Sequence, residues 1–489
     1  MPKATTRSAR SRSGGSQSPQ QSKPAGTTPK RTARSRPAFS SFAEALEFLD
    51  HRVNFEKVRP TQVDPAEFKL DRMRALLDKL DNPERDSRFV HVAGSKGKGS
   101  VVEMLASSLG ACGYAVGVFT SPHLVDVRER VRIGPTWIDE ESFVSLLART
   151  AEADASLPAK LGRSTFFELI TAVGLLYFAQ QAVDLAVMEV GLGGRLDSTN
   201  VIMPEVCALT AIQLEHTAIL GDTLAKIAFE KAGIMKPGVP AITVPQPPEV
   251  LEVFKSRAEE VQAPLHVLGE SIDFTDRFES SPDLGPHVRV CVSGPGGGYE
   301  HLAVPLQGHH QAANCGLSLA VLDMLRTRGF DAPERDVAIG LAATPRLGRL
   351  EQIWESPRIF VDGAHTPESL EALIKSIGSH IRYDSMVLVF GCAADKNIDA
   401  MLDRVAMGAD KVIFTKAADN PRAAKPEDLQ RRFLNRCSKM TQIEPTLKDA
   451  LNTAYRAVGR GDLICVTGSF YLAGEAKRLL SAAAAKREG

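Results

Sequence analysis

The chain of 489 residues lacks any long apolar run. Its longest such stretch, from Leu169 to Ala179, ends at two glutamines. A helix that crosses a bilayer needs about 20 apolar residues. The sequence therefore predicts that this is not a membrane protein, and its balance of 43% hydrophobic and 24% charged residues is that of a globular chain.

Cysteine is scarce, and its spacing excludes two classes of fold. The chain has seven cysteines, with no Cys-x-x-Cys pair and no Cys/His cluster at zinc-finger spacing. An odd, scattered set fits neither a disulfide framework nor a structural zinc site. We expect reduced core thiols, typical of a cytosolic protein; the cysteines are residues 112, 207, 291, 315, 392, 437 and 465.

Acidic residues are missing from residues 1–40, which contain nine Lys/Arg and no Asp/Glu. The remaining chain is mildly acidic, with 50 basic and 59 acidic residues. The basic segment is rich in Ser, Thr, Pro, Gly and Gln, so it buries too little apolar surface to offset chain entropy. We predict a disordered tail. An organelle-targeting peptide and a nucleic-acid-binding arm remain alternatives.

From Phe42 onward, short β-branched runs alternate with helical patterns, as in βαβ units. Buried strands of this kind form a parallel sheet, which binds its ligands at the carboxyl ends of the strands. The first series has predicted strands at 88–93, 115–120, 184–190 and 206–212, with helices at 100–112 and 166–181.

A second alternating series follows a predicted helix at 311–328. Its predicted strands are 358–361, 385–390, 411–415 and 462–466. Because the chain is too long for one ordinary core, we predict an α/β protein of two domains, 41–334 and 335–489. The Gly/Pro-rich stretch 293–298 is typical of a hairpin or turn, and no internal repeat is visible.

A glycine-rich segment follows the first predicted strand and leads into a helix. Glycines let backbone N–H groups close around phosphate oxygens, and a helix N-terminus adds a positive dipole. The strict P-loop pattern fails, because residue 92 is Val and Gly99 separates Lys98 from Ser100. Phosphate binding is still the favoured interpretation; the residues are Gly94, Ser95, Lys96, Gly97, Lys98, Gly99 and Ser100.

The variant pattern G-[ST]-x-G-K-G-[ST] resembles the P-loop of Mur-type amide ligases, and of the folylpolyglutamate synthase/dihydrofolate synthase family in particular. Further segments between about Phe42 and Lys477 resemble the same family in the same order: 119–124, 189–200, 214–223, 229–234, 308–314, 348–351, 362–367, 395–397 and 468–470. The resemblance implies an N-terminal P-loop Mur-ligase-like domain with a mainly parallel sheet, and a smaller C-terminal Rossmann-like α/β domain.

The resemblance also implies a Mg²⁺ site and a pterin site. Ser121, Glu189 and His216 match the metal ligands of the family. A carboxylate at the end of an apolar strand is costly to bury unless it meets a cation, and this supports Glu189 independently. Leu196, Asp197 and Ser198 match the positions that touch the pterin-containing substrate.

The remaining positions concern ATP and catalysis. Asn314, Asp362 and His365 match nucleotide contacts, and the guanidinium of Arg349 suits phosphate oxygens. Lys231 matches the lysine that this family carbamylates, so the resemblance gives catalytic roles to Lys98, His216 and Lys231. Two departures from the family pattern are Glu215, where many members have Asp, and Asn397, where the pattern has an acid.

By resemblance, the chain is an ATP- and Mg²⁺-dependent ligase that adds L-glutamate to a folate-type carboxylate through an acyl phosphate. The acceptor is folate, dihydropteroate or both, and a monovalent cation such as K⁺ is an optional cofactor. We expect a cytoplasmic monomer with small-molecule partners and no need for nucleic acid or membrane. A cell-wall Mur ligase, a nucleotide switch and a nucleic-acid-binding protein are the weighed alternatives.

Overall fold

The computed structural model describes residues 39–56, 69–281, 285–304, 309–418 and 420–488. Most of the predicted basic tail therefore lies outside the described residues. Phe39, which the sequence analysis assigned to that tail, is only 5% exposed, and its ring centroid lies 5.0 Å from that of Phe48 in helix α1 (Phe42–Asp50). The folded part of the chain thus includes Phe39, because its ring packs in an apolar cluster.

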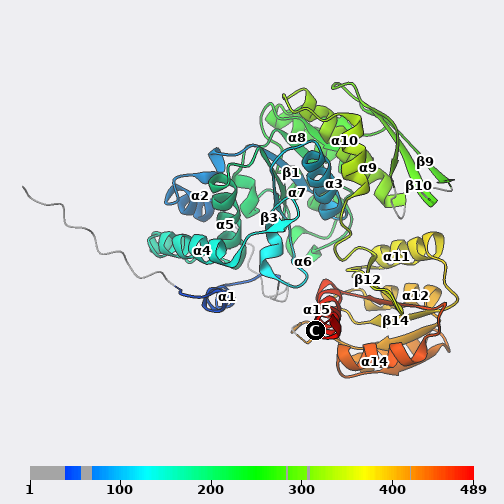
Figure 1. Cartoon of the computed structure of the whole chain (residues 1–489). Helices are drawn as coiled ribbons and strands as arrows, with labels where there is room; N and C mark the ends of the chain where they lie inside the picture. Colours follow the sequence, from blue (N-terminus) through cyan, green and yellow to red (C-terminus); the bar gives the residue numbers. More distant parts are fainter. Residues whose placement is uncertain (1–38, 57–68, 282–284, 305–308, 419, 489) are drawn as a thin grey trace, which may run out of the picture. The chain divides into compact units, whose positions relative to one another are not determined.

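The first sheet has eight strands in the order β4-β3-β2-β5-β1-β6-β7-β8; Figure 1 labels β1 and β3 of this sheet. Strands β2, β5, β1, β6, β7 and β8, in this spatial order, are parallel to one another, while β3 and β4 add an antiparallel edge next to β2. This confirms the mainly parallel sheet. The strands are β1 (Phe89–Ala93), β2 (Val116–Phe119), β3 (Val131–Ile133), β4 (Thr136–Trp137), β5 (Leu185–Glu189), β6 (Val206–Leu209), β7 (Ala241–Thr243) and β8 (Leu265–Val267).

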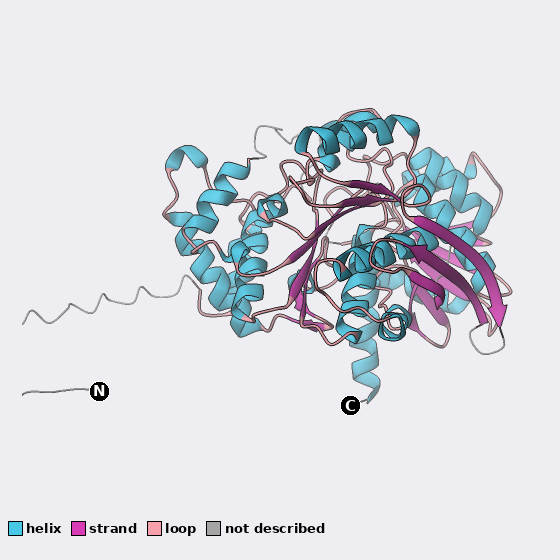
Figure 2. Ribbon diagram, turned by 90° about the horizontal axis from the view of Figure 1, so that it is seen from above, coloured by secondary structure: helices cyan, strands magenta, loops and turns pink. Residues whose placement is uncertain are grey.

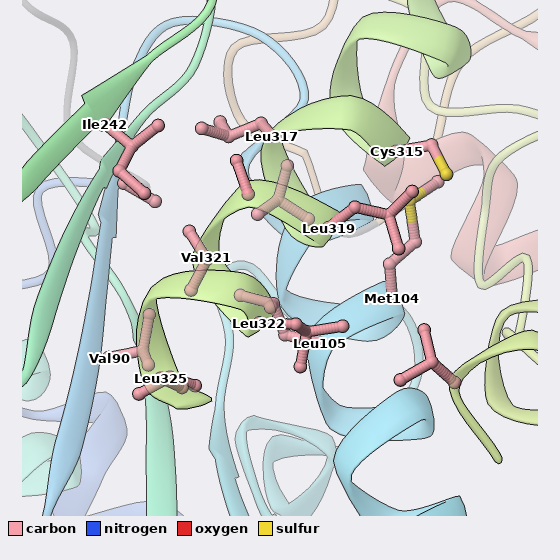
Figure 3. Close-up of a cluster of buried hydrophobic side chains, with 14 of the residues drawn as sticks. Val90, Met104, Leu105, Ile242, Cys315, Leu317, Leu319, Val321, Leu322 and Leu325 are labelled. Carbon is pink, nitrogen blue, oxygen red and sulfur yellow. The ribbon is translucent and has the colours of Figure 1, made fainter. Parts of the chain in front are cut away.

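Both faces of this sheet are buried, which explains why its strands are apolar throughout. Val90 and Val92 of β1 pack on one face with α3 (Lys98–Ala111) and α9 (His309–Arg326). Figure 3 shows this layer between the sheet and the two helices. The other face is covered by helices of two further clusters: α2 (Leu70–Asp78), α4 (Glu140–Ala155), α5 (Phe166–Gln180), α7 (Leu224–Ala232) and α8 (Pro248–Val261).

A three-stranded antiparallel sheet joins the first core through its buried face. Its strands are β9 (Asp273–Ser281), β10 (Gly285–Ser293) and β11 (Tyr299–Val304). The predicted turn at 293–298 is confirmed as the connection between β10 and β11. The strands themselves were not predicted, although Val288, Val290 and Val292 of β10 alternate with Arg289 and Cys291 in the pattern of a half-buried strand.

The second sheet has the order β12-β13-β17-β14-β15-β16 and is parallel except for β12. Helices pack on both faces of this sheet. Figure 2 shows the strands in magenta among the cyan helices. The strands are β12 (Glu351–Trp354), β13 (Arg358–Val361), β14 (Met386–Phe390), β15 (Lys411–Phe414), β16 (Met440–Ile443) and β17 (Leu463–Thr467). The helices are α11 (Pro367–His380), α12 (Ile398–Gly408), α13 (Pro426–Leu434), α14 (Leu447–Ala457) and α15 (Phe470–Glu488).

The connection between the two sheets runs through α10 (Glu334–Ala342), which packs on α3. Val337 and Leu341 are buried in the core of the first sheet, and β12 begins only at Glu351. These contacts favour a boundary within residues 343–350. The division at residue 335 itself stays a prediction.

All seven cysteines are free thiols. Four of them are buried, and the partly buried Cys112 and Cys437 pack against two of the apolar cores. Cys291 is also partly buried, and its thiol lies 3.4 Å from Nδ1 of His301. Among the helices that the structure describes, none is both long and apolar enough to cross a membrane.

Candidate active site

A cavity of about 540 Å³ lies at the carboxyl ends of the parallel strands of both sheets. It brings together nearly all of the residues that the sequence analysis selected. Gly94 and Lys231 do not line it, but the Nζ of Lys231 lies 2.9 Å from the carbonyl oxygen of Gly94, directly behind the P-loop. The lining includes Ser95, Lys96, Gly97, Lys98, Gly99, Ser100, Ser121, Glu189, Leu196, Asp197, Ser198, His216, Asn314, Arg349, Asp362 and His365.

The P-loop requires glycine at two positions. Gly94 has φ +144° and Gly97 has φ +93°, a region that side chains with a Cβ rarely adopt. A Cβ on Gly94 would lie 1.8 Å from Thr210 Oγ1, and one on Gly97 would lie 2.3 Å from Asn314 Oδ1. The two glycines thus let the side chains of Thr210 and Asn314 approach the loop closely.

The loop is fixed against the end of β6. The backbone N–H groups of Ser95 and Lys96 both donate to the carbonyl of Ala211, at 3.0 and 3.2 Å. Lys98 lies at the start of α3, and its Nζ donates to the carbonyl of Gly94 at 3.1 Å. A preformed loop with a lysine at a helix N-terminus is suited to phosphate oxygens.

Asn314 connects to Ser100 through Gln311 of α9. The amide of Asn314 donates to Gln311 Oε1 at 3.0 Å, and Gln311 Nε2 lies 3.4 Å from the Ser100 hydroxyl. Three side chains from two helices are therefore held in register along one side of the cavity.

Glu189 is the last residue of β5 and is only 4% exposed. Its Oε2 accepts a hydrogen bond from the backbone N–H of Ser121 at 3.2 Å. Burial raises the pKa of Glu189, while Lys98 and Arg349 oppose this shift. A buried carboxylate beside a serine offers the hard oxygen ligands that Mg²⁺ prefers, so these residues fit the predicted metal.

His216 has φ +48° and precedes the short helix α6 (Thr217–Leu220). Its side chain is accessible from the cavity. Desolvation by the surrounding residues nevertheless lowers the pKa of His216 to about 4, with Glu215 opposing the shift and Lys396 adding to it. A neutral imidazole is the form that can bind a metal. No group of three or more His, Cys, Asp or Glu at metal spacing occurs in the described part of the chain; the predicted set contains only two such residues.

Lys231 is 2% exposed, and its amine also donates to Glu215 Oε1 at 3.0 Å. Burial alone would raise the pKa of Glu215, but Lys231, Lys98 and Lys96 hold it well below its usual range. Burial lowers the pKa of Lys231, and the neighbouring Glu215 opposes this shift. A carbamate would, however, face the carboxylate of Glu215. Carbamylation of Lys231 stays a prediction.

Arg349 reaches the P-loop from the segment before β12. A Cβ on Gly99 would lie 2.0 Å from a guanidinium nitrogen of Arg349. The carboxylate of Asp362 holds the turn that carries Arg349, because it accepts hydrogen bonds from the backbone N–H groups of Leu350 and Ala364, both at 2.8 Å. Burial raises the pKa of Asp362 to about 6.

His365 lies at the start of α11 and is a neutral donor at Nδ1. That nitrogen lies 2.8 Å from the carbonyl oxygen of Gly363, so it carries the proton. Burial and the charge of Lys96 lower its pKa well below the usual range. Its Nε2 is thereby left as an acceptor, and the residue lines the cavity.

Leu196, Asp197 and Ser198 line another part of the cavity, together with Phe167 of α5. Asp197 is 5% exposed and accepts hydrogen bonds from the backbone N–H groups of Leu192 and Thr199, at 2.8 and 3.0 Å. An apolar wall beside a buried carboxylate suits a flat heteroaromatic ring with N–H donors.

Several lining residues were not assigned a role from the sequence. Lys396 follows β14, and Asn420 and Arg422 follow β15, so all three lie at strand ends of the second sheet. Arg422 pairs with Asp395 and donates to the carbonyl of Glu56 at 3.2 Å. The rule that ligands bind at the carboxyl ends of parallel strands could have selected these residues.

Comparisons with known proteins agree with this geometry. Residues 92–322 match the Mur ligase middle domain, and residues 348–470 match the Mur ligase glutamate ligase domain. The chain is 32% identical over 446 residues to the dihydrofolate synthase/folylpolyglutamate synthase of Bacillus subtilis, covering 90% of this chain and 100% of that protein.

Two solved structures are similar over almost their whole length. A Mycobacterium tuberculosis folylpolyglutamate synthase complexed with ADP has a TM-score of 0.80 at 30% identity, covering 90% of this chain and 98% of that one. E. coli FolC in complex with DHPP and ADP has a TM-score of 0.78 at 28% identity, covering 92% and 99%.

Proposed function

This chain belongs to the folylpolyglutamate synthase/dihydrofolate synthase family of Mur ligases, and on that premise we propose that it uses ATP to join L-glutamate to a folate-type carboxylate. The observation that carries the proposal is the cavity itself. It brings together the P-loop, Glu189, Arg349 and the wall formed by Leu196, Asp197, Ser198 and Phe167, which is called the Asp197 wall below.

The chemistry needs activation of the acceptor. A carboxylate is a poor electrophile in water, so ATP first phosphorylates it, and the glutamate amine then displaces phosphate from the acyl phosphate. Lys98 and Arg349 would hold the phosphoryl oxygens and stabilise the charge that develops on them. A cavity lined by both sheets would exclude water from the acyl phosphate.

The cofactors are proposed as ATP and Mg²⁺. Glu189, Ser121 and His216 would hold the metal, which would supply positive charge beside the transferring phosphate. Asn314 and His365 would contact the nucleotide, while Asp362 would act by shaping the turn that carries Arg349. A monomeric state, a cytoplasmic location and the role of the basic tail remain predictions.

An ADP-release assay tests the function. Purified protein receives ATP, Mg²⁺ and L-glutamate, with dihydropteroate or a tetrahydrofolate as the acceptor in turn. We expect ADP release that depends on one or both acceptors, and a new amide product by mass spectrometry. If neither acceptor raises ADP release while the protein still binds ATP, the proposed function is wrong.

The Lys98→Ala variant tests the ligase chemistry separately. Because Lys98 would neutralise phosphoryl charge in a water-poor site, turnover should fall by about 100-fold or more. The matched control is Lys375→Ala, which removes an exposed lysine of α11 that pairs with Glu371 on the surface. Equal turnover in the two variants would contradict the role of Lys98.

A further inference from the structure

A histidine lies in the middle of β1, one of the two central strands of the first sheet. His91 of β1 is fully buried and lies in register with Met188 of β5 and Cys207 of β6. An apolar residue would fill this position at lower desolvation cost. The Nε2 of His91 lies 2.9 Å from the hydroxyl of Thr199, so the polar ring has a specific partner.

The direction of this hydrogen bond follows from the next one. The Thr199 hydroxyl also contacts Asp197 Oδ1 at hydrogen-bond distance. A hydroxyl has one hydrogen, and an ionised carboxylate can only accept. The Thr199 hydrogen therefore goes to Asp197, and His91 must donate from Nε2.

The second ring nitrogen agrees with this assignment. His91 Nδ1 has no hydrogen-bond partner among the described residues, as expected for the nitrogen without a proton. Burial, with a smaller effect from Lys236, lowers the pKa of His91 to about 3. The Lys236 amine itself donates to the carbonyl of Asn200 at 3.0 Å. His91 is thus a neutral imidazole with a single, fixed donor.

The chain of donors ends on a carboxylate that lines the cavity. Oδ1 of Asp197 accepts from both the N–H and the hydroxyl of Thr199, which uses both of its lone pairs. Oδ2 accepts a bond from Leu192 N–H at 2.8 Å, and the backbone N–H of Gly191 also favours the ionised carboxylate. Burial raises the pKa of Asp197, and these donors oppose the shift, so they favour the ionised form.

We propose that His91 and Thr199 are positioning residues that hold Asp197 as an ionised acceptor for an N–H donor of the heteroaromatic end of the acceptor substrate. The relay would work in one direction only, because His91 can only donate to Thr199 and Thr199 then donates to Asp197. This inference rests on the proposed function, since it assigns the Asp197 wall to the folate-type acceptor.

The test uses variants that keep or remove each donor in the full-length protein. Thr199→Val removes the hydroxyl at nearly constant volume, and Thr199→Ser keeps it. His91→Met removes the ring donor, and His91→Gln keeps an amide N–H near the position of Nε2. For each variant we would measure kcat, the KM of the acceptor, ATP and glutamate, and the melting temperature.

The relay predicts a selective effect on the acceptor. In Thr199→Val and His91→Met, the acceptor KM should rise about tenfold, while the KM values of ATP and glutamate change less than twofold. Thr199→Ser and His91→Gln should recover most of the acceptor affinity. In the double variant His91→Met/Thr199→Val, the acceptor KM should be no higher than in Thr199→Val alone, because both changes break one relay.

Thr150→Val is the matched control. Thr150 is fully buried in α4, does not line the cavity, and donates to Leu146 O at 2.8 Å. This variant should lose stability without a change in acceptor KM. If Thr199→Val behaves in the same way, the relay is wrong. If His91→Met does not fold, the Thr199 pair still decides. Failure of the proposed function would show earlier, as absent acceptor-dependent ADP release in the unchanged protein.

Discussion

Each parallel sheet directs a carboxylate to the cavity from a strand end, but the two carboxylates have different partners. Glu189 of the first sheet accepts one hydrogen bond within the described part of the chain, from Ser121 N–H, and has the cations Lys98 and Arg349 nearby. Asp362 of the second sheet has one backbone N–H on each oxygen. Among the described residues, Glu189 thus has one oxygen without a hydrogen bond, which a metal could use, whereas both oxygens of Asp362 hold the turn that carries Arg349.

The two sheet edges therefore differ in what balances their buried charges. The edge of the first sheet is built from charge against charge, including the Lys231–Glu215 pair. Such an arrangement is costly to bury without a ligand that balances it. The edge of the second sheet uses carboxylate against backbone, which fixes loop geometry without any ligand. We therefore expect changes at the first edge to affect catalysis and changes at the second edge to affect stability.

Among the variants at the two edges, Glu189→Gln should show the greatest loss of turnover. Glutamine keeps the shape but removes the charge that would hold Mg²⁺, so acceptor-dependent ADP release should fall by about 100-fold or more. Burial disfavours the charged form of Glu189, so the melting temperature without Mg²⁺ should not fall. A variant that unfolds readily, or that retains full turnover, would break the distinction between the two edges.

A smaller effect should follow when the contact between the two edges is blocked. In Gly99→Ala, the new methyl group would occupy the place of the Arg349 guanidinium. Arg349 must move away from the P-loop, so the KM of ATP should rise and turnover should fall by about tenfold or more.

The control for this change lies in the same helix. A Cβ on Gly110 of α3 would meet nothing within 4 Å. Gly110→Ala should therefore leave turnover unchanged and be neutral or stabilising by up to about 1 kcal/mol. Similar ATP kinetics in the two alanine variants would show that Arg349 does not act at Gly99.

The sequence predicted the parts of this comparison that have a local signal. Buried parallel strands are continuous apolar runs, so the predicted strands lie within a few residues of those observed. The P-loop was recognisable because glycine at residues 94 and 97 reports a backbone conformation directly. The resemblance to the Mur ligases selected most of the other cavity residues.

The parts that were not predicted depend on partners far apart in the sequence. The short edge strands β12 and β16 are partly exposed, so their pattern is not that of a buried strand. Asp362 was expected to hold the nucleotide, and no sequence pattern shows that both its oxygens accept backbone N–H groups. His91 was read only as part of a strand, because its partner Thr199 is 108 residues away.

The smallest expected effect concerns stability in the Asp362→Asn variant. Its amide can accept only one of the two backbone hydrogen bonds, so the free energy of unfolding at pH 7 should fall by about 1–3 kcal/mol relative to the unchanged protein if the lost bond dominates.

The pH dependence separates this loss from the cost of the buried charge. Because the pKa of Asp362 is raised to about 6, the folded state holds this proton more tightly than the unfolded state. The stability contribution of the protonated carboxyl is therefore complete below about pH 4 and is lost as the pH rises through 6. Asparagine does not titrate, so the stability difference between the two proteins should shrink across this window, by at most about 3 kcal/mol and by less where cavity water solvates the carboxylate. Urea unfolding of both proteins from pH 4 to pH 7 measures the difference. A constant difference would mean that Asp362 is ionised throughout, and that the second edge, like the first, relies on a charge balanced by its neighbours.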